Sequence, residues 1–149
     1  MKEAIDKIRK YCAYQDRAES EVRLKLRQYE VSGAEADRII ASLKEDGFLD
    51  EERYVESFVR GKVNVKKWGR EKIKSHLLAK GVAATTIEKY LTEVNQELYS
   101  QNLQATMEKW LRMHPDQPAA SPALYRHLLS KGYSYQDIKP AIESESLNK

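Results

Sequence analysis

A run of basic side chains between residues 60 and 80 is the part of this sequence best suited to binding a partner. Eight cations stand there with a single acid, Glu71, among them, which leaves a local charge of +7. Clustered Lys and Arg neutralise phosphates, and each such contact adds affinity that depends on salt and not on base sequence. The run therefore favours a nucleic acid or an acidic surface as partner over the alternative, a solvated basic face. The cations are Arg60, Lys62, Lys66, Lys67, Arg70, Lys72, Lys74 and Lys80.

Trp68 lies inside this basic run and has two possible uses. Its ring could stack on a base or on an arginine, or it could fill a gap in a core. A tryptophan aligned within the repeat more often fills a core, which favours the core role. Arg70 and Lys74 stand four apart, so a helix would present both on one side.

Side chains that could carry catalysis are scattered along the chain. His76, His114 and His127 lie far apart in sequence, and no Cys/His pair has the spacing of a zinc site. The six glycines are dispersed and form no phosphate-binding loop. Cys12, the single cysteine, falls at an apolar phase, which predicts a small buried hydrophobe and not a reactive thiol. We expect no enzyme, no metal and no cofactor.

Charge is unevenly distributed over the 149 residues, whose formal net charge is +3. Residues 1–50 carry 10 basic and 11 acidic side chains, residues 51–96 carry 10 and 6, and residues 97–149 carry 6 and 6. The middle third is thus the electrostatically active one. No apolar run approaches the ~20 residues that a membrane span needs. The first six residues include two acids, Glu3 and Asp6, where a signal peptide would be apolar. We expect a cytoplasmic protein without membrane contact.

The apolar pattern repeats with a period of 51 residues, twice over. Six columns of apolar residues align without a gap, which is the mark of a repeat architecture. Tandem helical modules form extended surfaces and each contacts mainly its neighbours. The columns are Ile8, Val59 and Trp110; Val22, Ile73 and Leu124; Leu26, Leu77 and Leu128; Val31, Val82 and Tyr133; Ala36, Ile87 and Ile138; and Ile40, Leu91 and Ile142.

Helical spacing runs through nearly the whole chain, and no alternating apolar run predicts a strand. Asp50 is expected to cap the helix that follows it, and Ser121-Pro122 indicates another helix start. Pro140 is expected in the first turn of the last helix, with Asp137 as the cap, because early helical positions need no backbone donor.

These signals predict an all-α fold of three tandem three-helix, helix-turn-helix-like repeats of about 50 residues, forming an elongated, curved array. The predicted modules are residues 1–49, 50–96 and 97–149.

The middle of the chain resembles the RecX family of recombination regulators. The segments that carry the resemblance are Gly47-Phe48-Leu49-Asp50-Glu51-Glu52-Arg53-Tyr54-Val55, Phe58-Val59-Arg60, Gly69-Arg70-Glu71-Lys72-Ile73 and Leu77-Leu78-Ala79-Lys80-Gly81-Val82. They are similar to that family's Gly-aromatic-Leu-Asp-Asp start, Arg-aromatic pair, Lys-Gly-x-x-x-Ile segment and Leu-x-x-Lys-Gly-Val close. The resemblance is strong over 47–91, looser over 17–46 and weak after 95.

Three positions depart from the family pattern. Glu51 replaces the usual second Asp and keeps its charge, and Tyr54 stands where Phe is common. Trp68 replaces a basic residue that often precedes the glycine, so a phosphate contact at this position is in question.

The resemblance implies an all-helical protein of three three-helix modules that acts in DNA repair, recombination and the SOS response. It implies binding to the RecA recombinase filament, in its helical groove on single-stranded DNA, and inhibition of its ATPase, coprotease and strand-exchange activities. The partners expected are that filament and single-stranded DNA, with double-stranded DNA as a further candidate. We expect a monomer. The contact residues expected are Arg53, Arg60, Lys62, Lys66, Lys67, Arg70, Lys72 and Lys74.

Two other functions remain open from the sequence. A helix-turn-helix protein that reads duplex DNA would prefer one site sharply over random DNA. The segments after the predicted turns, 83–94 and 134–146, are poor in Lys and Arg, whereas a reading helix usually carries several. A plain protein–protein scaffold would have no salt-dependent affinity for nucleic acid.

Overall fold

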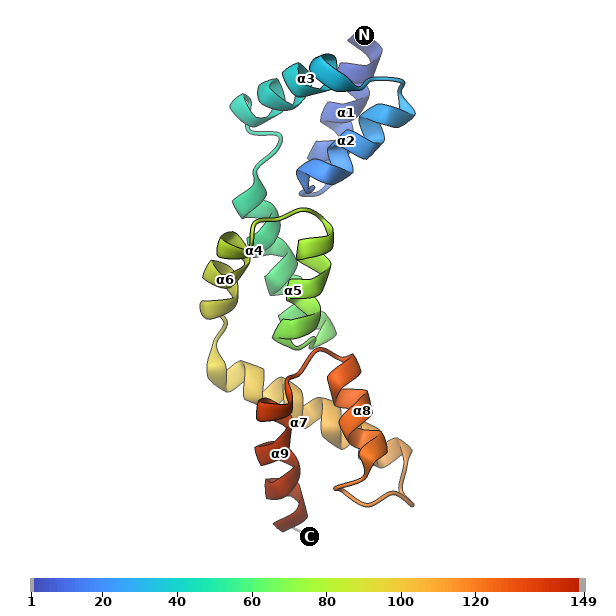
Figure 1. Ribbon diagram of the computed structural model, residues 1–149, viewed down its shortest axis with the longest axis vertical. Helices are drawn as coiled ribbons and strands as arrows, with labels where there is room; N and C mark the ends of the chain where they lie inside the picture. Colours follow the sequence, from blue (N-terminus) through green and yellow to red (C-terminus); the bar gives the residue numbers. More distant parts are fainter. Residues whose placement is uncertain (1, 148–149) are drawn as a thin grey trace. The chain divides into compact units, whose positions relative to one another are not determined.

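The computed structural model describes residues 2–147, and every regular element within them is helical (Figure 1). The prediction of an all-α fold is therefore confirmed for this part of the chain. In chain order the elements are α1 (Lys2–Tyr14), α2 (Glu19–Gln28), α3 (Gly33–Glu45), α4 (Glu51–Gly61), the π-helical turn η1 (Lys62–Lys66), α5 (Arg70–Ala79), α6 (Ala84–Thr92), α7 (Gln96–Met113), α8 (Pro122–Ser130) and α9 (Tyr135–Leu147).

All eighteen residues of the six repeating columns are buried. The least buried of them, Trp110, is 8% exposed, and nine, including Ile8, Val22 and Leu124, are fully buried at 0%. A 51-residue shift in sequence therefore corresponds to a structural repeat of the core. Burying a side chain of this size contributes roughly 1.5–3 kcal/mol, so these columns account for much of the stability of the fold.

The chain forms two compact units. Unit 1 comprises Met1–Phe58 and Leu77–Ile87, and unit 2 comprises Val59–His76 and Glu88–Lys149. The division falls within α4, α5 and α6, whose residues belong partly to each unit. The three modules predicted from the repeat remain a prediction, because the compact units do not follow their boundaries.

Unit 1 contains a core built by α1, α2 and α3. Ile8, Val22 and Leu43 lie at its centre, and Phe48 packs against it from the connection that follows α3. Cys12 belongs to the same core and is 4% exposed. Burial raises the pKa of its thiol, so the residue is the inert small hydrophobe that the sequence predicts.

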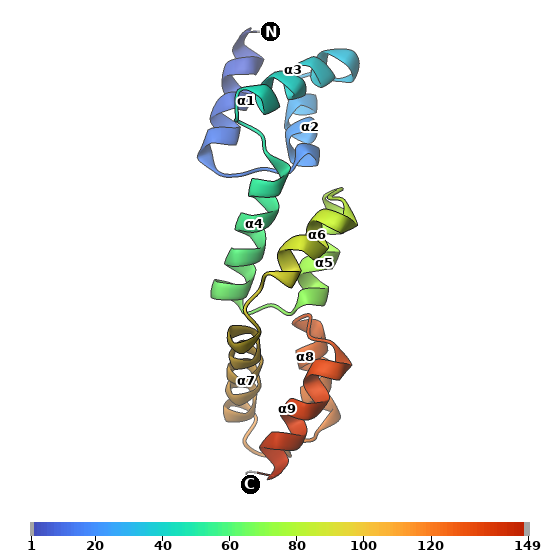
Figure 2. The same cartoon turned by 90° about the vertical axis from the view of Figure 1, so that its left-hand side faces the viewer.

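Unit 2 contains a second core built by α7, α8 and α9, which pack together in both views (Figures 1 and 2). Tyr99 of α7 and Tyr133, just before α9, meet there with ring centroids 5.4 Å apart. Each of these tyrosines is 1% exposed. Burial raises the pKa of both hydroxyl groups, so both stay protonated over the physiological range. The Tyr99 hydroxyl accepts a hydrogen bond from the backbone N–H of Arg70 at 2.9 Å.

Two of the predicted helix starts are confirmed by their hydrogen bonds. The carboxylate of Asp50 accepts from the backbone N–H of Arg53 at 3.1 Å. The hydroxyl of Ser121 accepts from the backbone N–H of Leu124 at 3.2 Å, and Pro122 is the first residue of α8. Each bond satisfies a donor that the first helical turn would otherwise leave unpaired.

The prediction for Pro140 is wrong. Ser134, and not Asp137, caps α9: its hydroxyl accepts from the Asp137 backbone N–H at 3.2 Å. The helix therefore begins at Tyr135 and contains Pro140 in its interior. A proline there removes one helical hydrogen bond, but Ile138 and Ile142 on either side of it are buried and hold the helix against the core.

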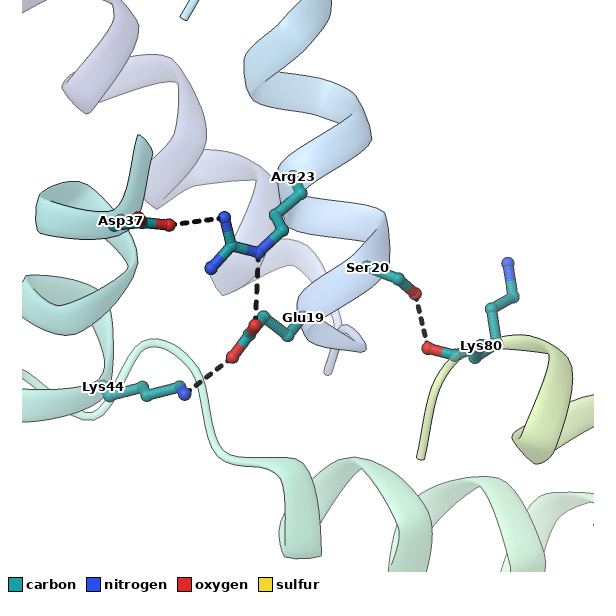
Figure 3. A network of polar contacts seen from close by, with 6 residues as sticks. All are labelled: Glu19, Ser20, Arg23, Asp37, Lys44 and Lys80. Atoms are coloured by element: carbon teal, nitrogen blue, oxygen red, sulfur yellow. Dashed lines mark hydrogen bonds and ion pairs between the residues drawn. The ribbon is translucent and has the colours of Figure 1, made fainter. Parts of the chain in front are cut away.

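A helix start and a turn meet in unit 1, and we call this contact the N-terminal junction. The Ser20 hydroxyl at the start of α2 donates to the Lys80 carbonyl, in the turn after α5, at 2.6 Å (Figure 3). The ammonium of Lys80 lies 3.4 Å from the carboxylate of Glu21. Side chains make both of these contacts.

An equivalent contact in unit 2, the C-terminal junction, joins the start of α5 to the turn after α8. The backbone N–H of Gly69 donates to the Lys131 carbonyl at 2.8 Å, and that of Glu71 donates to the Gly132 carbonyl at 2.9 Å. A Cβ atom added to Gly69 would overlap the backbone of Gly132. Only glycine permits so close an approach of two backbones.

Candidate nucleic-acid interface

The π-helical turn η1 extends α4 and carries two of the predicted contact lysines. Lys66 is its last residue, and the chain leaves it through Lys67 at a φ of 56°. A left-handed backbone is uncommon for a residue with a side chain. The backbone N–H of Trp68 donates back to the Lys62 carbonyl at 3.0 Å, which closes the turn. Single π-turns and left-handed residues concentrate at functional sites.

Two buried side chains from outside the turn hold η1 in place. The amide of Asn102 on α7 donates to the Val63 carbonyl at 2.9 Å. The hydroxyl of Tyr133 donates to the Lys67 carbonyl at 2.6 Å. Asn102 is 4% exposed and Tyr133 is 1% exposed, and a buried donor left without its acceptor costs about 1–3 kcal/mol. The position of Lys66 and Lys67 is thus fixed by the core of unit 2.

Lys66 and Lys67 line a groove that also involves α7, His127 of α8 and the end of that helix. We call it the α7–α8 groove; its volume is about 780 Å³, and all of its lining residues belong to unit 2. None of these lining residues is acidic. Its cationic members are Lys66, Lys67, Lys109, Arg112 and Lys131.

Trp68 gathers two further lysines around one half-buried ring. The ammonium groups of Lys62 and Lys72 lie 4.5 and 4.2 Å from its ring centroid, and the His76 ring lies at 4.7 Å. An aromatic face attracts a cation through its quadrupole. Trp68 therefore serves as a packing platform for charged side chains.

Two more of the predicted contact residues are held by neighbours within unit 2. The guanidinium of Arg70 lies 3.9 Å from the ring centroid of Tyr99 and donates to the Gln96 side chain at 3.1 Å. The ammonium of Lys74 pairs with Glu88 at 3.3 Å. Partner binding at Arg70 or Lys74 would compete with these contacts.

Arg53 belongs to unit 1, whereas Arg60 and the other predicted contact residues belong to unit 2. Its guanidinium pairs with Asp16 at 2.6 Å and also donates to the carbonyls of Gly47 and Phe48. Arg53 thus holds the connection between α3 and α4 against the end of α1. Its role in binding a partner remains a prediction.

Sequence reasoning missed the contribution of the third predicted module to this site. Lys109, Arg112 and Lys131 lie more than forty positions after Lys66, in a part of the sequence with no net charge. One local signal was available, because residues 109 and 112 stand three apart and share a side of α7.

Two of the histidines, His114 and His127, lie against the same ring, that of Trp110. His114 stacks on Trp110 with centroids 4.1 Å apart, and His127 lies 6.4 Å from the same ring. Nδ1 of His114 lies 2.8 Å from the Trp110 carbonyl, which fixes the tautomer that carries its proton on Nδ1. Across residues 2–147, no group of three or more His, Cys, Asp or Glu side chains is arranged to hold a metal ion.

Sequence comparison matches the first part and the middle of the chain to known domains. The profile of the first three-helix domain of RecX matches residues 4–43, and that of the second matches residues 50–91. Together they cover more than half of the chain. The chain belongs to the RecX family.

Curated relatives and solved structures agree with this assignment. Regulatory protein RecX of Streptococcus agalactiae serotype V is 30% identical over 140 residues, which cover 93% of this chain and 54% of that protein. Regulatory protein RecX of Clostridium botulinum is 33% identical, over 89% of this chain and 63% of that one. The chain thus spans between half and two thirds of the length of these relatives.

The crystal structure of RecX from Lactobacillus salivarius superposes with a TM-score of 0.81 at 26% identity, over 99% of both chains. A match over 99% of the chain extends well beyond residue 95, into the part where the sequence resemblance is weakest. No helix within residues 2–147 is long and apolar enough to span a membrane.

Proposed function

We propose that this chain is a non-enzymatic regulator that binds a RecA recombinase filament on DNA and inhibits its ATPase, coprotease and strand-exchange activities. Membership in a family whose curated members are named regulatory proteins supports this proposal. The contact residues proposed are the eight cations predicted from the sequence: Arg53, Arg60, Lys62, Lys66, Lys67, Arg70, Lys72 and Lys74.

The geometry of η1 carries the proposal. A residue on a mobile loop loses backbone conformational entropy when it binds, at a cost of about 1–2 kcal/mol for each residue that becomes fixed. Asn102 and Tyr133 fix the backbone beneath Lys66 and Lys67 before any partner arrives. A basic turn that is set in place by buried hydrogen bonds suits recognition of a regular polyanionic polymer.

The recombinase ATPase on single-stranded DNA provides the test. The protein is added at increasing ratios to a RecA filament on poly(dT), and we expect ATP hydrolysis to fall. A Lys66→Ala, Lys67→Ala double variant should require more protein for the same inhibition. A variant with Lys10→Ala and Arg38→Ala removes the same charge from exposed sites in unit 1 and should inhibit like the wild type. If the wild-type protein does not inhibit ATP hydrolysis at stoichiometric ratios, the proposal is wrong.

Direct binding to DNA gives a second measure of the same lysines. Each phosphate contact on duplex DNA contributes about 0.9 to the slope of affinity against salt, so loss of both lysines should flatten the slope by about two. The loss should be uniform across sequences. A sharp preference of the wild type for one duplex site would favour the helix-turn-helix reader instead.

A further inference from the structure

The α7–α8 groove combines charges in a way that selects anions. Five cations line it, and no carboxylate does. Lys66 and Lys67 approach it from η1, Lys109 and Arg112 from α7, and Lys131 from the end of α8. Arg112 also lines a neighbouring pocket with Glu108 and Glu145, whereas within residues 2–147 none of the four groove lysines forms an ion pair with an acid. Cations that converge on one groove raise the local potential and repel one another, so an anionic ligand stabilises the arrangement.

One of the two histidines that line the groove, His127, carries no charge at pH 7. Burial, and after it the charges of Lys131 and His114, hold the pKa of His127 below its ordinary value. Its ring is therefore neutral at pH 7, and the five permanent cations supply the charge of the groove.

The groove also presents apolar surface to solvent. Val65 and Met113 are 73% and 67% exposed, which is unusual for side chains of this kind. The ring of His114 adds an aromatic surface, half-buried and stacked on Trp110. A phosphate group gains nothing from contact with apolar side chains, whereas an unpaired base buries its faces on apolar and aromatic side chains.

We infer that the α7–α8 groove binds a single strand of nucleic acid, with its phosphates on the lysines and arginine and a base against Val65, Met113 and His114. A duplex offers the same phosphates but keeps its bases stacked inside. The volume of about 780 Å³ lies within the range of about 300–1,000 Å³ typical of small-ligand sites, which suits a nucleotide-sized segment of a strand.

This inference deepens the proposed function and rests on it for its biological setting. It adds a contact made by the third predicted module, through residues that the sequence did not single out. Binding to oligonucleotide is measured without recombinase, so the groove and the regulatory activity can fail separately.

The test uses fluorescence anisotropy of labelled dT20 with the full chain. The variant Lys109→Ala, Arg112→Ala, Lys131→Ala removes three groove cations and leaves the predicted contact lysines intact. Each contact to a single strand contributes about 0.7 to the salt slope, so we expect the slope to fall by about two and the affinity at 0.15 M salt to fall at least about tenfold. Wild-type protein should bind dT20 more tightly than a duplex of the same length.

A matched variant controls for total charge. Lys10→Ala, Arg38→Ala, Lys139→Ala removes three cations from exposed positions outside the groove and should change the affinity less than about twofold. Circular dichroism confirms that both variants fold. Equal losses in the two triple variants, or an unchanged affinity in the groove variant, would overturn the inference.

Two further results separate the sources of binding. An oligonucleotide with abasic sites should bind more weakly than dT20, and Val65→Ser with Met113→Ser should abolish that difference; an abasic strand that binds equally would rule out the base contact. If the groove variant binds dT20 normally yet no longer inhibits the recombinase, the groove contacts an acidic protein surface, which contradicts the inference and preserves the proposed function.

Discussion

The two junctions occupy equivalent places in the repeat but are built from different chemistry. A shift of 51 residues carries Ala18 onto Gly69 and Gly81 onto Gly132. At the N-terminal junction the contacts are a Ser20 side-chain hydrogen bond and an ion pair. At the C-terminal junction they are two hydrogen bonds between backbones, and two glycines face each other.

The turn glycines show the difference most directly. Gly81 and Gly132 both follow a helix with positive φ, at 84° and 102°. A Cβ on Gly81 would meet no atom within 4 Å, whereas one on Gly132 would overlap Lys72. The same local turn is thus open in unit 1 and tightly packed in unit 2. Backbone contacts fix a position, while exposed side chains allow adjustment.

The largest expected effect comes from Gly132→Ala, compared with Gly81→Ala. A left-handed alanine costs about 1–2 kcal/mol at either site. Overpacking against Lys72 adds roughly 1–3 kcal/mol at Gly132 alone. Urea unfolding followed by circular dichroism reports on both units and should show the larger loss for Gly132→Ala, while fluorescence of the two tryptophans, which both lie in unit 2, follows that unit alone. Equal destabilisation by the two substitutions would contradict the proposed difference between the junctions.

Gly69→Ala should have the next largest effect. Its Cβ would overlap backbone atoms of Gly132, which cannot rotate away as a long side chain can. We expect the free energy of unfolding to fall by about 2 kcal/mol. Gly61→Ala is the matched control, because Gly61 has helical φ and ψ and open space around it. That substitution should raise stability by about 0.5–1 kcal/mol, so a loss of stability in both variants would argue against the backbone contact.

The sequence predicted the repeating core because burial leaves a periodic signal. All six columns are buried, and Asp50 and Ser121 cap their helices as expected. A cap involves residues three apart, so a short window contains the whole interaction. The position of Pro140 was predicted wrongly because the rule used was also local. That rule places a proline near a helix start, whereas the packing of the flanking isoleucines keeps Pro140 in the helix interior.

The candidate site was only half predictable. The basic run is contiguous and therefore visible, but the buried donors beneath it come from distant positions. The bond from Asn102 to Val63 spans 39 residues, and that from Tyr133 to Lys67 spans 66. Nothing in the local pattern marks a buried asparagine as a support for a remote turn. The contact of Gly69 with Gly132 was hidden likewise, because a glycine that ends a helix needs no tertiary explanation.

Lowering the pH should weaken the contacts between α2 and α3 beside the N-terminal junction, because it protonates Glu19. This carboxylate pairs with Lys44 at 2.6 Å and with Arg23 at 3.2 Å (Figure 3). The hydrogen bond from Lys44, above all, holds the pKa of Glu19 below its ordinary value. The ionised form therefore stabilises the fold at pH values above the ordinary pKa, and that stability is lost as pH falls through the lowered value.

Glu19→Gln tests this dependence. We expect a loss of about 0.5–1 kcal/mol at pH 7, kept small by solvent screening of a partly exposed pair. Because the wild-type carboxylate takes up a proton as the pH falls through its lowered pKa, the difference in stability between the two proteins should be smaller at pH 3 than at pH 7. Urea unfolding by circular dichroism at the two pH values measures the difference, and Glu45→Gln, on an exposed residue of α3, serves as the control. A gap that stays constant with pH would show that Glu19 stabilises by packing and not by charge.

The smallest expected effect is that of Ser20→Ala, which removes the hydrogen bond to Lys80. Both partners are exposed, so water replaces the hydroxyl at the carbonyl and the loss should stay below about 0.5 kcal/mol. Thermal unfolding followed by circular dichroism measures this loss, and Gly69→Ala is measured under the same conditions for comparison. A loss from Ser20→Ala as large as that from Gly69→Ala would mean that a single side chain fixes the N-terminal junction as firmly as two backbones fix the other. In that case the chemistry of a junction would not determine its rigidity. The expected tenfold or greater difference between their unfolding constants, about 1.4 kcal/mol or more, follows only if close backbone packing is what separates the two junctions.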